Sequence, residues 1–387
     1  MVKAIKVMLI PNNVQKTKLF QYAGASRFAY NWALAREIEN YEKGGKFISD
    51  AELRKEFTKL RHSDEYAWLL NISNNVTKQA IKDACTAYKN FFRGLQKFPR
   101  FKSKKRSMPK FYQDNVKIRF SNTHVKFEGF SSSRKANKQK MNWVRLAEHG
   151  RIPTDVKYMN PRISFDGLNW WISVCVEFPD CRETLNDDGV GIDLGIKDLA
   201  VCSDGTKYKN INKSQKVKKL EKQKRRLQRS ISRSYEKNKK GESYCKTNNV
   251  IKKEKLLLKR NHRLTNIRKN YLNQTISEIV NRKPRFICIE DLNVSGMMKN
   301  RHLSKAVQEQ GFFWFRKQLE YKCSDKGIQL IVADRFYPSS KLCSCCGNIK
   351  KDLKLSDRVY RCACGNMIDR DFQASINLKT YGEKFAG

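Results

Sequence analysis

Four cysteines near the C-terminal end constrain the fold of this chain more than any other feature. Cys343 and Cys346 form a Cys-x-x-Cys pair, and Cys362 and Cys364 form a second, tighter pair. A glycine follows each pair and permits the tight turn that aims backbone groups at a metal. Thiolates at this spacing can close a tetrahedral zinc site, which is a small fold held by metal rather than by an apolar core. We therefore predict a zinc ribbon with these four ligands. Cys345 lies inside the first pair and is an alternative ligand to its neighbours, but we favour a spare thiol.

The composition indicates a partner with many negative charges. The 387 residues include 80 lysines and arginines against 38 aspartates and glutamates, for a formal net charge of +42. Such a surface attracts nucleic acid, because each neutralised phosphate releases counterions. A ribosomal-type or disordered basic protein is the alternative. The chain is 40% hydrophobic and 11% aromatic, with regular apolar periodicity, so we favour a folded protein.

The sequence predicts neither secretion nor a membrane partner. The N-terminal stretch MVKAIKVMLIPNN lacks the apolar region of a signal peptide, and no apolar run approaches the length that spans a bilayer. The twelve cysteines are paired at the C-terminal end or scattered singly, which fits a reducing compartment. We expect a cytoplasmic protein that associates with the nucleoid.

The first half of the chain predicts a β-barrel or sandwich interrupted by helices. Residues 2–10 alternate like a strand, and Pro11 ends it. A helical pattern follows, and strand signals separated by Gly and Asn turns then return. We assign residues 1–10 and 108–183 to a β-barrel domain and residues 11–107 to a helical insertion.

The second half has the element order of an RNase H-like α/β domain. Its pattern is a strand hairpin, two long basic helices, a strand, a helix, a strand and a final helix. We assign residues 184–336 and 366–387 to this domain, and residues 337–365 to the zinc ribbon inserted in it. The predicted fold class is therefore α+β with several domains.

Three acids mark the ends or starts of elements in this second half. Asp193 lies in the strand GIDLG, Glu290 ends the apolar strand ICIE, and Asp371 opens the final helix. An acid in a buried strand is costly unless it faces a cation. Mg²⁺ prefers carboxylate oxygens and water, and two ions about 3.5–4 Å apart can activate a water and stabilise the leaving oxygen of a phosphodiester. The three acids therefore predict a nuclease site.

Each acid also has a simpler interpretation. Asp193 can be a turn acid, and Asp291, next to Glu290, can be a helix cap. Asp369 and Asp371 can both cap the last helix or pair with Arg370. The order of the acids, and their place beside the cysteine pairs, favours the catalytic interpretation.

With these residues in place, the chain resembles the TnpB family, the OrfB-type proteins of insertion sequences that are related to miniature type V Cas12 effectors. The matching segments are VGIDLGIKDLAVCSDG, ICIEDLNVSGMMKN, SSKLCSCCG and YRCACGNMIDRDFQASINL, together with LFQYAGASRFAYNWAL and the PRFKSK loop. The resemblance covers nearly the whole chain. The chain departs from the usual pattern in its Cys-x-Cys second pair, and in Phe372-Gln373, where many members have an aliphatic residue and Asn.

The resemblance implies a transposon-encoded, RNA-guided endonuclease with a single RuvC-type site that cuts double-stranded DNA beside a short target-adjacent motif. Asp193, Glu290 and Asp371 match the family's three acids, with Asp369 the other candidate for the third. Implied cofactors are Mg²⁺, as two ions, and Zn²⁺. Implied partners are a guide RNA and the target DNA, with an element-encoded transposase at the same locus. We expect a monomer with a barrel-type wedge domain and a helical recognition domain.

Basic segments supply candidate contacts to these partners. The stretch Lys216 to Ser234 predicts a helix with a dense basic face, and Lys102 belongs to a basic loop that also contains aromatic residues. Alternative functions are an RNA-guided DNA-binding repressor without cutting, and a transposition accessory protein that binds DNA without a guide. A CRISPR effector with the same chemistry is a further possibility.

Overall fold

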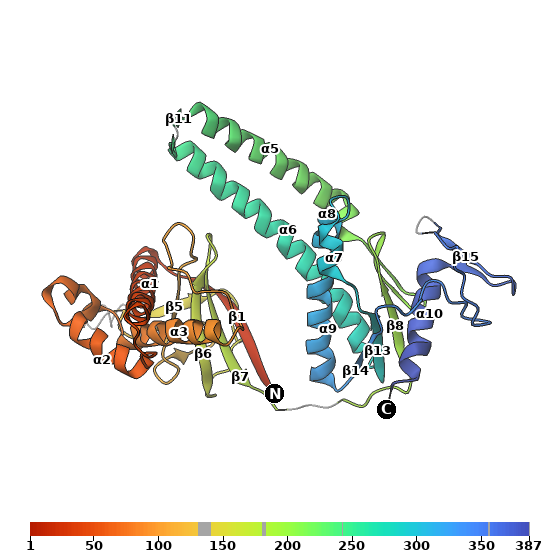
Figure 1. Ribbon diagram of the computed structural model, residues 1–387, viewed down its shortest axis with the longest axis horizontal. Coiled ribbons are helices and arrows are strands. Elements are labelled where there is room, and N and C mark those ends of the chain that lie inside the picture. Colours follow the sequence, from red (N-terminus) through yellow and green to blue (C-terminus); the bar gives the residue numbers. More distant parts are fainter. Residues whose placement is uncertain (131–140, 180–182, 242, 355–356, 387) are drawn as a thin grey trace. The chain divides into compact units, whose positions relative to one another are not determined.

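The computed structural model describes residues 1–130, 141–179, 183–241, 243–354 and 357–386 (Figure 1). The chain divides into two compact units, residues 1–179 and residues 180–387. Across the described ranges, no helix combines the length and the apolar character that a membrane span requires.

The first unit contains a seven-stranded antiparallel sheet in the order β2-β6-β7-β1-β5-β4-β3. β1 (Val2–Ile10) lies near its centre and pairs with β7 along most of its length, which confirms that the first strand joins strands much later in the chain. The other strands are β2 (Lys110–Tyr112), β3 (Arg119–Phe120), β4 (His124–Lys126), β5 (Trp143–Leu146), β6 (Tyr158–Phe165) and β7 (Trp170–Glu177).

Of the predicted β-barrel or sandwich, the barrel is wrong, because the described strands of this unit form one open sheet. Among the described residues the sheet is open, with β2 at one edge and β3 at the other. These edge strands have only three and two residues, so they offer too few backbone groups to pair and close the sheet. Helices pack against the sheet and share its apolar core, which removes the need for closure.

The helices of the first unit lie between β1 and β2 in the sequence, as the pattern predicted. They are α1 (Asn13–Glu42), α2 (Asp50–Arg61) and α3 (Asn74–Phe92), with a 3₁₀ helix at Asp64–Asn71. Pro11 follows β1, and Asn12 then caps α1 by accepting a hydrogen bond from the backbone N–H of Gln15 at 2.9 Å. α1 and α3 pack on each other, with Leu19 and Ile81 among the buried residues of one core.

The second unit is built on a five-stranded mixed sheet in the order β10-β9-β8-β13-β14. β8, β9 and β10 are antiparallel neighbours, whereas β13 runs parallel to both β8 and β14. The strands are β8 (Val190–Leu194), β9 (Asp198–Cys202), β10 (Lys207–Lys209), β13 (Phe286–Glu290) and β14 (Gln329–Ala333).

Helices cover both faces of this sheet. Apolar residues of α6 (Asn248–Asn281) and α9 (Phe312–Lys326) pack with Ile192 and Ile289 on one face. On the other face, Leu378 of α10 (Arg370–Glu383) packs with Phe286 and Cys288. Successive side chains of a strand point to opposite faces, so the residues of β8 and β13 divide between these two cores.

Two long helices extend from this sheet as an antiparallel pair (Figure 1). α5 (Gln215–Lys237) and α6 pack together through a small apolar contact that includes Leu220 and Leu264. The short strands β11 (Lys239–Lys240) and β12 (Ser243–Tyr244) lie at the far end of the pair. The basic stretch that the sequence predicted to be helical is therefore most of α5.

The single helix that the sequence predicts between the last two strands of this domain is divided in two. α8 (Ser304–Gln310) ends at Gly311, whose φ of +70° is left-handed, and α9 begins directly after it. A further short helix, α7 (Val294–Lys299), follows β13. The cysteine segment contributes the small strand pair β15 (Val359–Arg361) and β16 (Met367–Asp369), and α10 begins directly after β16.

Candidate active site and metal centre

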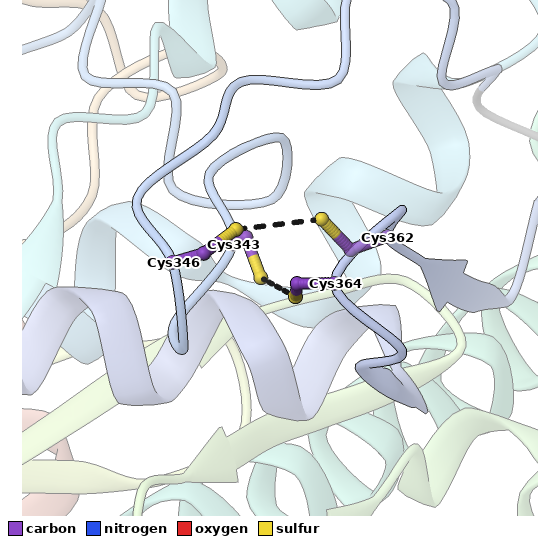
Figure 2. Close-up of side chains that lie close together, drawn as sticks. All are labelled: Cys343, Cys346, Cys362 and Cys364. Atoms are coloured by element: carbon purple, nitrogen blue, oxygen red, sulfur yellow. Dashed lines mark hydrogen bonds between the residues drawn. The ribbon is translucent and has the colours of Figure 1, made fainter.

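The structure brings the four paired cysteines together (Figure 2). Their sulfur atoms all lie within 4.8 Å of one another, with 3.6 Å between Cys343 and Cys364 and 3.6 Å between Cys346 and Cys362. Four thiolates around Zn²⁺ at about 2.3 Å would have sulfur atoms about 3.8 Å apart. The cysteines are free thiols, so this arrangement fits a tetrahedral ion and not a pair of disulfides.

Two turns that each end in a glycine hold these sulfur atoms. Gly347 and Gly365 have φ angles of +71° and +88°, which only glycine adopts without strain. The N–H of Gly347 donates to the carbonyl of Cys343 at 3.0 Å, and the N–H of Gly365 donates to that of Cys362 at 3.1 Å. Cys345 is exposed and lies outside the sulfur cluster, as expected for a spare thiol.

Cys343 is prepared to be a thiolate. Its burial would raise its pKa, but N–H groups that point at its sulfur outweigh this effect and lower the pKa to about 6. The donors are the backbone N–H of Cys346 and the side-chain amide of Asn366, at 3.4 Å from the sulfur. A thiolate is the form of cysteine that binds a metal, so this environment favours the ligand role.

Buried amides join the cysteine segment to α10. Gln373 donates to the carbonyl of Leu342 at 2.6 Å and accepts from Ser344 at 2.9 Å. Asn377 donates to the carbonyls of Ser339 and Leu342, both at 2.7 Å. Sequence reasoning did not assign these roles; the departure from the family pattern at Gln373 was the one signal at that position.

Two of the three predicted acids lie side by side on the sheet. The last paired positions of β8 and β13 are Ile192 and Ile289, so continuing this register places Asp193 next to Glu290. Since Ile192 and Ile289 face α6 and α9, alternation directs both carboxylates to the opposite face, which α10 covers. Asp371 lies in the first turn of α10, so that helix brings the third acid to the same face.

Gly191 of β8 allows the backbone of α10 to lie very close to the sheet. A Cβ on Gly191 would lie 2.0 Å from the carbonyl oxygen of Ser375 and 2.3 Å from the backbone nitrogen of Lys379. The backbone of α10 therefore rests directly on β8, two residues before Asp193. This contact determines how far α10 lies from the sheet, and α10 carries Asp371.

The three acids influence one another electrostatically. Burial raises the pKa of Asp193 well above its usual value, and the charges of Glu290 and Asp371 raise it further. Burial also raises the pKa of Glu290, which a hydrogen bond from the hydroxyl of Ser339 opposes. Repulsion of this kind is relieved when cations bind between the carboxylates, so the donor set fits hard divalent ions.

Asp369 and Asp371 have different surroundings. Asp369 is the N-cap of α10 and accepts from the backbone N–H groups of Asp371 and Phe372, both at 3.1 Å. Its burial would raise its pKa, but the N–H of Phe372 and the nearby Lys207 lower it overall. Asp371 caps nothing and pairs instead with Arg370 at 3.2 Å. The helix-cap interpretation therefore applies to Asp369.

The carboxylates are less tightly gathered than the cysteines. In the parts of the chain that the structure describes, only the four cysteine sulfur atoms form a group of three or more potential ligands close enough to bind one ion. The three carboxylates do not form such a group. Asp371 is held by Arg370 and lies 3.9 Å from Arg358, and Glu290 is held by Ser339. A cation at this face would compete with Arg370 and Arg358 for the carboxylate of Asp371.

A cleft opens beside Glu290. Its cavity volume is about 500 Å³, within the range of small-ligand sites. Asp291 lies at this cleft and pairs with Arg316 at 2.7 Å and with Arg335. Hydrogen bonds from these two arginines lower the pKa of Asp291, so it is an ionised structural acid. The cap of α7 is instead Asn293.

The basic helix α5 presents its charge to solvent. It contains ten lysines and arginines but only two glutamates, Glu221 and Glu236. Its buried residues are Val217, Leu220 and Ile231, so almost all of the basic side chains lie on the surface. Glu221 pairs with Arg268 of α6 at 3.1 Å, which ties the two helices together and leaves a strongly cationic surface.

Comparison with known proteins places the chain in a family. Sequence models of three domains match it: "Helix-turn-helix domain" of the OrfB_IS605 type at residues 1–46, the OrfB_IS605 "Probable transposase" at residues 173–301, and "Cas12f1-like, TNB domain" at residues 312–378. Together these models cover parts of both compact units.

Relatives match along nearly the whole length. "Putative RNA-guided DNA endonuclease InsQ" of Escherichia coli K12 is 31% identical over 379 residues, which cover 93% of this chain and 87% of the relative. A "Putative RNA-guided DNA endonuclease" of Streptomyces pristinaespiralis is 29% identical, with 98% and 89% of the two chains covered.

A solved structure shares the fold. The chain in "Cryo-EM structure of the Cas12f1-sgRNA-target DNA complex" matches with a TM-score of 0.58 at 13% identity, over 98% of both chains. The similarity to InsQ over most of both sequences, together with the matched domain models, decides the family. The chain belongs to the TnpB family, the OrfB-type proteins of IS605-like insertion sequences.

Proposed function

We propose that this protein is a transposon-encoded, RNA-guided DNA endonuclease that cleaves double-stranded DNA beside a short target-adjacent motif. The observation that carries the proposal is the convergence of Asp193, Glu290 and Asp371 on one face of a mixed sheet. The relatives named as RNA-guided DNA endonucleases support the same activity. Because all three acids are present, we favour a cutting enzyme over a binding-only repressor.

The domain assignment follows the strand order. We assign residues 184–336 and 366–387 to a RuvC-type, RNase H-like domain, since β9 and β10 flank β8 and the parallel strands β13 and β14 follow on its other side. Residues 337–365 form the zinc ribbon. Residues 1–10 and 108–183 form the wedge domain, built on an open sheet, and residues 11–107 form the recognition domain.

The three acids would hold Mg²⁺, as two ions. When bound, the ions supply the charge that activates a water and stabilises the leaving oxygen of the phosphodiester. Asp193 and Glu290 are held rigidly by neighbouring strands, and Ser339 orients Glu290. Asp371 is carried by α10, whose first turn Asp369 caps. One such site would cut the two DNA strands in turn.

The four cysteines hold a structural Zn²⁺. Their sulfur spacing and the lowered pKa of Cys343 support this assignment. Gln373 and Asn377 tie the ribbon to α10, so the metal would also stabilise the start of the helix that carries Asp371. The ribbon then serves the active site by holding a helix in place.

The partners are a guide RNA and the target DNA. Base pairing between them would supply sequence recognition, while the protein holds the duplex by shape and backbone. The cationic surface of α5 is suited to that role. We propose that the protein acts as a monomer and that an element-encoded transposase shares its locus.

The test is guide-directed cutting by a purified ribonucleoprotein. The protein is expressed with its flanking DNA, the bound RNA is sequenced, and target plasmids are offered with Mg²⁺. We expect Asp193→Ala to abolish cutting and to retain guide-dependent DNA binding. Asp187→Ala is the matched control, because Asp187 is an exposed acid a few residues earlier. Cutting that survives in the Asp193 variant, or a preparation without a defined RNA, would exclude the proposed function.

A further inference from the structure

A small cationic pocket lies within the first compact unit, whereas the three acids belong to the second. Its cavity volume is about 30 Å³, enough for a few polar atoms. Side chains from α1, α3, β2, β6 and the loop between α3 and β2 line it, including Arg27, Asp83, Lys102, Lys110 and Arg162. Five separate segments therefore converge on one charged site.

The loop that carries Lys102 is fixed in position by α1. The side-chain amide of Asn31 donates to the carbonyl of Lys102 at 2.8 Å and accepts from its N–H, also at 2.8 Å. The ammonium of Lys102 lies 3.0 Å from the centre of the Tyr30 ring. This ring is buried, so the lysine is partly buried and held at one place rather than extended into solvent.

The one carboxylate of the pocket is already occupied. Arg162 binds both oxygens of Asp83, at 2.6 and 3.1 Å, and Gln79 donates to the same group at 2.9 Å. Within the described ranges, Arg27, Lys102 and Lys110 have no carboxylate within 4.0 Å, although Lys102 has the ring contact described above. The pocket therefore places four basic side chains around one carboxylate.

Such an arrangement is unfavourable for the protein alone. Burial lowers the pKa of Lys102 to about 7, and repulsion from Lys110 adds to this effect, while Asp83 opposes it. A lysine that served only the fold would be better replaced by an apolar side chain or paired with an acid. The excess positive charge is best explained by an anion that completes the pocket from outside.

We propose that this pocket binds one backbone phosphate of a nucleic acid, with Lys102 as its central ligand and Arg27 and Lys110 at its rim. Phosphate oxygens are the anionic groups that a strongly cationic protein meets on its polyanionic partner. The identity of that partner rests on the proposed function. The phosphate belongs to the guide RNA or to the target DNA, and the test separates the two.

The test maps single phosphates in the presence and absence of Lys102. The wild-type ribonucleoprotein, Lys102→Met and the control Lys104→Met are compared; Lys104 is an exposed lysine of the same loop. Phosphates of the target DNA are randomly ethylated, and phosphates of the guide RNA carry random phosphorothioates. Binding then selects the molecules whose modifications are tolerated.

We expect the Lys102→Met protein to bind one of the two nucleic acids about tenfold or more weakly than wild type does. Modification of one phosphate, or of two adjacent phosphates, should weaken binding by wild type and leave binding by Lys102→Met unchanged. Lys104→Met should keep that sensitivity. The strand that carries the phosphate identifies the source. We also expect the free Lys102→Met protein to melt no lower than wild type, because the substitution removes the burial of an ammonium group and its repulsion from Lys110.

A folded Lys102→Met protein with the complete wild-type pattern on both nucleic acids would overturn the proposal. A lower melting temperature with unchanged binding would assign Lys102 a structural role and would also overturn it. If Lys102→Met fails to fold, Lys110→Met at the exposed rim should lose the same phosphate. A wild-type protein that binds nucleic acid without guide-directed recognition would refute the proposed function, while the comparison of phosphates would still decide the pocket.

Discussion

Replacing Gly191 by alanine should separate DNA cutting from DNA binding. The new Cβ would lie 2.0 Å from the carbonyl oxygen of Ser375, whereas ordinary contacts begin at 3.4 Å. The obstructing atoms are backbone of α10, so the helix itself must move by more than about 1 Å. α10 carries Asp371, and a displacement of about 1 Å in a catalytic group can reduce a rate by roughly 100-fold. Overpacking of this kind costs about 1–3 kcal/mol of stability.

The assay is single-turnover cleavage of a matched DNA target by the purified ribonucleoprotein, beside an equilibrium binding measurement. We expect Gly191→Ala to slow cleavage by roughly 100-fold and to leave guide-dependent binding within a few-fold of wild type. Gly195→Ala is the control, because Gly195 directly follows β8 and its Cβ would meet only one atom, the carbonyl oxygen of Asp198, at 3.1 Å.

Two results would refute this reasoning. Full cleavage by a folded Gly191→Ala protein would show that the close approach of α10 does not position the third acid. Equal losses in the Gly191 and Gly195 variants would show that the strand is sensitive to any added side chain, whatever lies opposite it.

Three further predictions concern the metal ligands and the acids. Cys343→Ser should remove bound zinc and lower the melting temperature, and unchanged zinc content by elemental analysis would contradict the ligand set. Asp371→Asn should abolish cutting while Asp369→Asn retains it, because asparagine still caps a helix; the reverse result would make Asp369 the third acid. In EDTA, Asp193→Asn should raise the melting temperature at neutral pH. The pKa of Asp193 is raised in the folded state, so the wild-type protein loses stability as the pH rises through that pKa. Below about pH 4 the carboxyl is protonated in both states, and the gain in melting temperature from Asp193→Asn should disappear. A gain that does not change with pH would contradict the repulsion among the acids.

The sequence alone predicted the elements that depend on local patterns. Cys343 and Cys362 begin their pairs at spacings that the structure turns into one sulfur cluster. β1, β13 and α10 were also expected close to their observed bounds, because apolar periodicity and Pro11 mark them locally. The first strand was expected to join the strands that follow the helical insertion, and its register with β7 confirms this.

The placement of the acids needed knowledge of topology. Asp193 and Glu290 share a face only because β8 and β13 are parallel neighbours in a fixed register, and one residue of slippage would separate them. The RNase H-like element order made this expectation possible. We propose their metal-binding role from the chemistry of the carboxylate set.

Other features were beyond the sequence. A sheet closes into a barrel only when its two edge strands pair, and no local sequence pattern encodes that pairing. The predicted barrel is therefore found as an open sheet. The hydrogen bonds of Ser339, Gln373 and Asn377 join segments more than 30 residues apart in the chain. The break at Gly311 was also missed, because a glycine inside a helical pattern is compatible with a continuous helix.

Reprogramming the guide tests the central claim most directly. The guide segment of the co-purified RNA is exchanged, and two plasmids, one matching the old guide and one matching the new, are incubated with the ribonucleoprotein in Mg²⁺ or in EDTA. The proposed function predicts that cutting moves to the plasmid that matches the new guide, requires Mg²⁺ and disappears with Asp193→Ala. Cutting that ignores the guide, or that persists without Asp193, would contradict it.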